Sequence, residues 1–109
     1  MMNEAVKAGE VFHLKDMVPY KERAVNRIPI IVNDHMKFMI VSMDEGQGLP
    51  EHVAAGDAVF FALEGEAVIT YDGRDYPVKA GDNFHFAKDV LHSVVAKGRF
   101  KMAVVMTLE

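Results

Sequence analysis

Two of the five histidines, His52 and His92, are the side chains of this chain best suited to chemistry. Each lies in a segment that begins with a glycine, residues 46–65 for His52 and residues 81–96 for His92. Imidazole titrates near neutral pH, and its neutral form has a free ring nitrogen, so a histidine pair can transfer protons or bind a divalent metal. The chain has no cysteine, which excludes thiolate nucleophiles and thiolate metal sites.

Common motifs for other chemistry are missing from the sequence. There is no Gly-x-Ser-x-Gly elbow, no phosphate-binding glycine-rich loop before a helix, and no His-Glu-x-x-His pair. The other histidines, His13, His35 and His85, are candidates for a further metal ligand. An exposed or hydrogen-bonded structural role is nevertheless the usual one for a histidine.

The composition indicates an ordinary globular domain. Half of the 109 residues are apolar, 26% are charged, and the formal net charge is −4. Because nucleic-acid binding usually needs a basic face, and the Lys and Arg residues are scattered, we expect no nucleic-acid partner. No apolar stretch is long enough to span a membrane, and the first residues lack the apolar core of a signal peptide. We therefore expect a cytoplasmic protein that does not bind membranes.

Short apolar segments separated by turn residues predict nine or ten β-strands, the pattern of an all-β sandwich or barrel. Asp72-Gly73 predicts a tight hairpin turn, and Glu64-Gly65 a second turn. Pro77 has no backbone N–H to donate, so it should lie at a sheet edge or at a strand end. The expected strands are Val11–Leu14, Ile28–Val32, Met36–Met43, Asp57–Leu63, Glu66–Tyr71, Arg74–Lys79, Asn83–Phe86, Leu91–Ala96 and Lys101–Thr107.

The N-terminal region differs from the rest. Residues 15–26 predict an irregular arm with one turn of helix, because Pro19 interrupts any longer one. We expect residues 1–27 to form an arm with the first strand and residues 28–109 to form the barrel, within one domain. Residues 58–63 and 101–107 are apolar on both strand faces, which predicts that the arm or another subunit covers the second face.

The histidine segments resemble the two sequence motifs of the cupin family. In the first, Gly46, His52 and Gly65 match in type and spacing, while Ala54 and Ala58 stand at the positions of a second His and a Glu. In the second motif Gly81 and His92 match, and the departures are Ala87 for Pro, Asp89 for Gly and Ala96 for Asn. Residues 49–52, 63–67, 79–81 and 99–102 look similar to a subgroup of small single-domain cupins. The resemblance implies a small antiparallel β-barrel of the jelly-roll type.

In cupins, the two histidines and the Glu of the first motif and the His of the second bind a divalent metal. The resemblance therefore implies that His52 and His92 occupy metal-ligand positions. Two imidazoles would hold Zn, Ni, Fe, Mn or Cu weakly, because zinc sites use three or four protein ligands. The alternative is a pair of buried histidines that are hydrogen-bonded to each other, to the backbone or to water.

Alanines in place of two ligands enlarge the cavity, which favours binding of a small organic molecule in the barrel. The alternatives are a metal-dependent dioxygenase, isomerase or lyase acting on a small polar substrate, and a metal-free cyclase or dehydratase that uses the histidines as acid and base. The resemblance and the doubly apolar strands also imply a homodimer. The expected pocket residues are His52, His92, Phe60, Met39, Met102 and Phe86.

Overall fold

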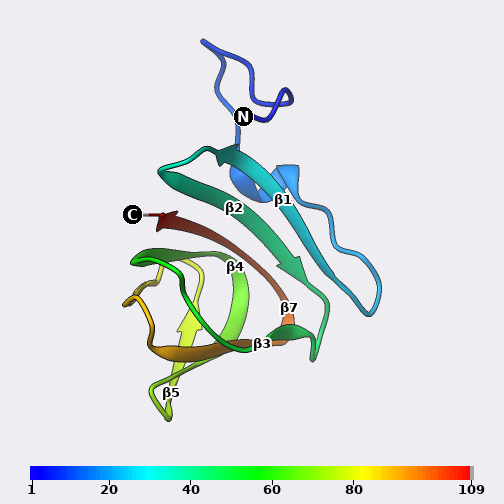
Figure 1. Ribbon diagram of the computed structural model, residues 1–109. Coiled ribbons are helices and arrows are strands. Elements are labelled where there is room, and N and C mark those ends of the chain that lie inside the picture. Colours follow the sequence, from blue (N-terminus) through cyan, green and yellow to red (C-terminus); the bar gives the residue numbers. More distant parts are fainter. Residues whose placement is uncertain (109) are drawn as a thin grey trace.

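Seven antiparallel strands and one short 3-10 helix make up the fold of residues 1–108 (Figure 1). The computed structural model describes residues 1–108. No helix within these residues has the length and apolar character needed to cross a membrane. The elements are η1 (Leu14–Met17), β1 (Val25–Val32), β2 (Met36–Met43), β3 (Gly48–Val53), β4 (Ala58–Tyr71), β5 (Arg74–Lys79), β6 (Asn83–Phe86) and β7 (Leu91–Thr107).

Two long strands, β4 and β7, pair with each other along most of their length and divide the barrel into two layers. The first half of β4 pairs with the second half of β7, and with β6, β2 and β1 they form what we call the β1 layer. The second half of β4 pairs with the first half of β7, and with β3 and β5 they form the β3 layer. The expected all-β antiparallel barrel is thereby confirmed.

The expected turn at Glu64-Gly65 is wrong. Gly65 has φ +81° and lies inside β4, where the β4–β7 register shifts between Ala62 and Glu66. A residue with positive φ in a strand produces a bulge and a bend without ending the strand. Gly98, with φ +77°, lies within β7 in the same way. Two pairs of expected short strands are therefore one bent strand each, and both layers belong to a continuous sheet.

The strand expected at Val11–Leu14 is not formed. Val11 is 91% exposed, and Leu14 begins the helix η1. A new strand needs the free edge of another strand to pair with. Near the end of β1 that edge is already occupied by the first three residues of the chain. Met2 bridges to Ile31, and the Asn3 N–H donates to the Ile30 carbonyl at 2.7 Å. The rest of the arm is irregular apart from η1, as the sequence predicted.

The hairpin between β4 and β5 is confirmed. Asp72 and Gly73 both have positive φ, 49° and 80°, which is the geometry of the two-residue turns that close hairpins. Pro77 lies in β5, the last strand of its layer, and pairs only with β4. Because β5 is an edge strand, the missing N–H of Pro77 does not cost a hydrogen bond between two central strands.

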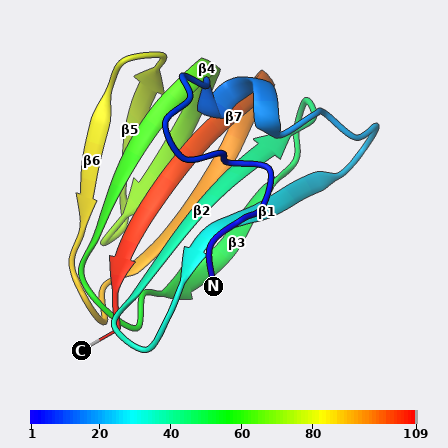
Figure 2. The same cartoon turned by 90° about the horizontal axis from the view of Figure 1, so that it is seen from above.

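The apolar side chains form two clusters, one inside the barrel and one under the arm. The inner cluster includes Phe60, Phe100 and Ile69, each fully buried. The arm runs over the outer side of the β1 layer (Figure 2), and its buried Val18 belongs to the outer cluster. Its partners there are Ile30, Ile40 and Ala103. The arm thus covers part of the second apolar face, one of the two possibilities that the sequence left open.

Polar contacts also hold the arm against the barrel. The Tyr20 hydroxyl donates to the Glu64 carboxylate at 2.5 Å. Burial raises the pKa of Tyr20, and the nearby Glu64 carboxylate raises it further. The cationic groups of Arg99 and Lys101 lie 4.9 and 4.8 Å from the centre of the Tyr20 ring. These contacts fasten the arm near the bend of β4.

Candidate functional site

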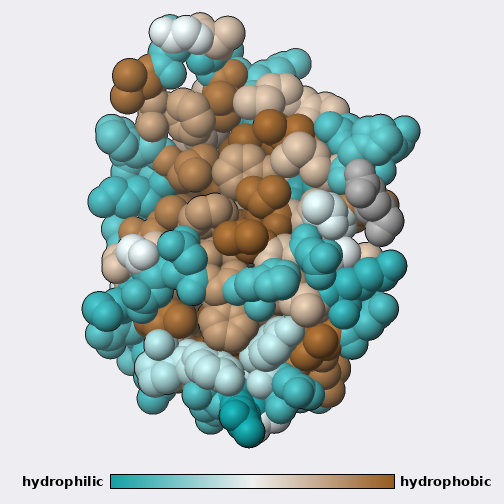
Figure 3. Space-filling view, turned by 90° about the vertical axis from the view of Figure 1, so that its left-hand side faces the viewer, coloured by the Kyte–Doolittle hydropathy of each residue, from teal (hydrophilic) through white to brown (hydrophobic). Residues whose placement is uncertain are grey.

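A cavity of about 270 Å³ lies between the two layers and opens at one end of the barrel. Its size is near the lower end for small-molecule pockets, about 300 to 1,000 Å³. On the left-hand face of Figure 1, apolar side chains gather in the centre and hydrophilic ones surround them (Figure 3). The lining consists of Lys37, Met39, Leu49, His52, Val53, Ala54, Ala55, Ala58, Phe86, His92, Val94, Met102, Val104 and Met106.

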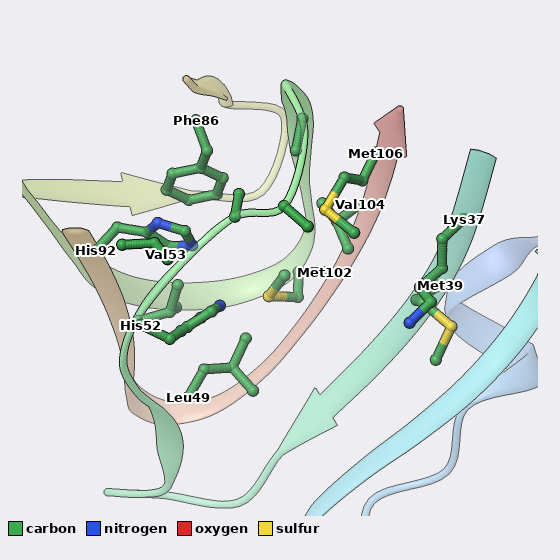
Figure 4. A pocket seen from close by; sticks show the side chains of 14 residues that line it. Lys37, Met39, Leu49, His52, Val53, Phe86, His92, Met102, Val104 and Met106 are labelled. Carbon is green, nitrogen blue, oxygen red and sulfur yellow. The ribbon is translucent and has the colours of Figure 1, made fainter. Parts of the chain in front are cut away.

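His52 and His92 lie directly opposite each other on neighbouring antiparallel strands, β3 and β7. Their ring centres are 4.3 Å apart, and the ring planes are inclined at 56°. Both side chains line the cavity at its β3-layer wall (Figure 4). The structure thus brings together the two histidines that the resemblance to the cupin motifs had singled out.

The backbone determines which ring nitrogen of each histidine is available. His52 Nδ1 lies 2.7 Å from the Pro50 carbonyl oxygen, and His92 Nδ1 lies 3.0 Å from that of Val90. A carbonyl oxygen only accepts hydrogen bonds, so Nδ1 carries the proton and donates in both cases. In the neutral rings Nε2 then has a free lone pair. Each residue can accept a hydrogen bond or a proton from a molecule in the cavity.

The two histidines differ in their surroundings. His92 is buried and stacks on Phe86, with ring centres 4.2 Å apart and planes inclined at 19°. Burial lowers the pKa of His92, and the neighbouring His52 lowers it further. His52 is exposed at the mouth of the cavity, so the expectation of two buried histidines holds only for His92.

The donor atoms present do not fit a resident metal with three or four protein ligands. Ala54 and Ala58 are buried and face the cavity with methyl groups, at the positions where the family motif has a His and a Glu. Within residues 1–108 no group of three or more His, Asp or Glu side chains is arranged to hold a metal ion. Two imidazoles alone are a weaker set than known zinc sites provide.

None of the other histidines joins the pair. His85 is exposed and its Nε2 lies 3.8 Å from an Asp57 carboxylate oxygen. His13 precedes η1, and His35 lies in the turn between β1 and β2. Both are exposed, and neither lines the cavity.

Five of the expected pocket residues line the cavity: His52, His92, Met39, Met102 and Phe86. Phe60 does not line it. Its ring is fully buried between Phe86 and Phe100, with centres 5.9 and 6.0 Å away, and it supports the wall from behind.

Sequence reasoning missed other residues that line the cavity. Met106 and Val104 could have been found from the alternation of β7, because they share the face of Met102. Lys37 shares a strand face with Met39 and could have been found in the same way. Leu49 could not, because alternation places it opposite to His52. A register shift between Leu49 and His52 brings both into the cavity.

The sequence profile of the cupin domain matches residues 39–108, which is more than half of the chain. Together with the two-layered barrel, this match shows that the chain belongs to the cupin family.

Several solved structures share the fold. A cupin superfamily protein from Desulfitobacterium hafniense is 24% identical, with a TM-score of 0.91 over 95% of each chain. A conserved protein of unknown function from Streptococcus pyogenes is also 24% identical, with a TM-score of 0.90 over 95% of this chain and 91% of the other. A cupin 2 conserved barrel protein from Leptotrichia buccalis is 29% identical, with a TM-score of 0.85 over 88% of this chain and 47% of the other. No curated protein matches the sequence.

Proposed function

We propose that this cupin binds a small organic molecule inside its barrel, with His52 and His92 as one polar end of a largely apolar pocket. The observation that carries the proposal is the pair of histidines whose Nδ1 atoms are held by backbone carbonyls. Their Nε2 lone pairs then serve as hydrogen-bond acceptors next to Met102, Leu49 and Val94. Apolar walls with a few placed polar groups are typical of ligand pockets.

The same arrangement favours a ligand that donates a hydrogen bond. An Nε2 lone pair in apolar surroundings loses its contacts with water when a ligand enters, so a ligand without a donor leaves it unsatisfied. A phenol, an amide or an alcohol would satisfy it. A weakly held divalent metal at the histidine pair, the arrangement of a metal-dependent enzyme, is the competing proposal. An acid–base catalyst without metal would use the same Nε2 atoms as proton acceptors.

The test compares p-cresol with 4-methylanisole, which has the same ring but no hydroxyl proton. Protein purified without added metal and treated with chelator would be followed by NMR of the methionine methyl groups. We expect p-cresol to shift Met39, Met102 and Met106 and to bind about three- to tenfold more tightly than 4-methylanisole, the effect of one neutral hydrogen bond. Met17, which lies outside the cavity, is the internal control.

Two variants connect the result to the histidines. His92→Phe keeps a ring against Phe86 but removes the acceptor, and His52→Ala removes the other acceptor. In either variant the affinity for p-cresol should fall towards the affinity for 4-methylanisole. His85→Ala, outside the cavity, should leave the difference between the two affinities unchanged. Equal binding of the two probes, or binding that disappears after chelation, would contradict the proposal. In the second case a metal at the pair would be required.

A further inference from the structure

Among residues 1–108, Lys37 is the only Lys, Arg, Asp or Glu in the cavity lining, and it lies on the wall opposite the histidines. It belongs to β2 of the β1 layer, where it pairs with Met106, while His52 and His92 belong to the β3 layer. Figure 4 shows Lys37 and Met39 on one side of the cavity and the histidines on the other. The cavity therefore has two separated polar ends.

No acidic group balances Lys37 within the part of the chain that the structure describes. The cavity lining contains no Asp or Glu, and no carboxylate of residues 1–108 is close enough to the Lys37 ammonium to form an ion pair. The side chain lines the cavity and is also exposed, so its charge can stay hydrated beside the apolar lining. A positive charge beside an apolar cavity is complementary to an anionic group on a bound molecule.

We infer that the cavity selects small organic acids, with the carboxylate at Lys37 and a hydrogen-bond donor at the histidine pair. This inference rests on the proposed function and names its ligand class. One lysine offers one positive charge, which suits a monoanionic carboxylate. A phosphate would carry more charge and need further donors, and the lining around Lys37, namely Met39, Val104 and Met106, is apolar. The separated polar ends also require an apolar body between the two groups of the ligand.

Three probes that share a phenol ring test the inference: 4-hydroxyphenylacetate, the neutral 4-hydroxyphenylacetamide and the cationic tyramine. Their dissociation constants would be measured from the methyl signals of Met39, Met102 and Met106. We expect the acid to bind about three- to tenfold more tightly than the amide, because Lys37 is exposed and its ion pair is partly screened. Tyramine should bind most weakly, and 0.5 M salt should reduce the preference for the acid.

Charge variants assign the preference to one residue. Lys37→Gln should bring the acid and the amide to equal affinity, and Lys37→Arg should keep the preference. Lys97→Gln removes an equally exposed charge outside the cavity and should change nothing. An acid that binds no better than the amide, or a preference that persists in Lys37→Gln, overturns the inference but leaves the proposed function standing. If neither the three probes nor p-cresol shift the methyl signals, both the inference and the proposed function are overturned.

Discussion

At the scale of single residues, the site depends on which side chains face the cavity and which protons they carry. The Nδ1 atoms of the two histidines donate to the backbone carbonyls of Pro50 and Val90, which leaves Nε2 free in the neutral rings. Ala54 and Ala58 stand at the positions where the family motif has a His and a Glu. At these two positions the wall is therefore apolar, and the two histidines are its hydrogen-bond acceptors.

Restoring the missing ligands should restore metal binding. We expect the double variant Ala54→His, Ala58→Glu to retain about one divalent metal per chain after dialysis, because four ligands replace two. Elemental analysis of the wild type should give much less than one equivalent. Ala55→Glu adds a carboxylate elsewhere in the lining and serves as the control. A wild type that retains a full equivalent would contradict this account of the site.

The buried His92 should make stability depend on pH. Burial and His52 hold the pKa of His92 below its ordinary value of 6.5, so the folded protein favours the neutral ring. The unfolded chain therefore binds the proton more readily, and protonation favours unfolding. The contribution of His92 to stability is complete above pH 6.5 and is lost as pH falls through its folded pKa.

Melting temperatures between pH 8 and pH 5, recorded with an NMR titration of His92, check this prediction. We expect the melting temperature to fall on acidification over the range in which His92 titrates. His52→Ala should raise the pKa of His92 and weaken that dependence, because the electrostatic effect of His52 on His92 is removed. A His92 that titrates at or above pH 6.5 would refute the argument.

At the scale of elements, the bends of β4 and β7 allow two strands to serve both layers. At the bend of β4, position 65 suits glycine better than any other residue for two reasons. Its φ of +81° is strained for other residues, and a Cβ there would lie 2.1 Å from the Arg99 carbonyl oxygen in β7. The glycine thus allows a close approach between the two strands at the point where they turn from one layer to the other.

Gly65→Ala should destabilise the barrel much more than Gly73→Ala. Both positions have φ near +80°, but a Cβ at Gly73 meets nothing within 4 Å. We expect Gly73→Ala to cost about 1 kcal/mol for the left-handed conformation alone. Gly65→Ala should cost at least about 2 kcal/mol more, because backbone atoms must move. Urea unfolding midpoints measure both, and equal losses would show that the close approach contributes nothing.

At the scale of the whole molecule, the outer face of the β1 layer is only partly covered by the arm. Register places Ile31, Phe38, Val105 and Val59 side by side across four strands. The first three are half-buried, and Val59 is 43% exposed. Side chains in register lie on one face of a sheet, so these four form a continuous apolar row.

We expect a second copy of the chain to cover this row and form a homodimer. Val59→Lys should then shift the population towards monomer in sedimentation at micromolar concentration, because a charge would be buried at the interface. Val95→Lys is the matched control, since Val95 is 46% exposed on the β3 layer. A wild type that sediments as a monomer under these conditions would exclude the dimer.

The sequence by itself determined the features that depend on local chemistry. Alternating apolar residues predicted the strands, and the Asp72-Gly73 pair predicted the hairpin. Both depend on residue type and short-range geometry, such as a positive φ or side-chain alternation. The cupin barrel and the meeting of His52 and His92 were implied by the resemblance to the cupin motifs, not by local geometry.

Tertiary structure alone decided which side chains share the cavity and how exposed they are. The register shift in β3 places Leu49 with His52, against the alternation of the strand. Pairing of β4 with β7 turned an expected loop at Gly65 into a bend. The opposition of Lys37 and the histidines likewise depends on two layers whose strands are distant in the chain. Register between distant strands depends on packing and bulges, which alternation within one strand does not contain.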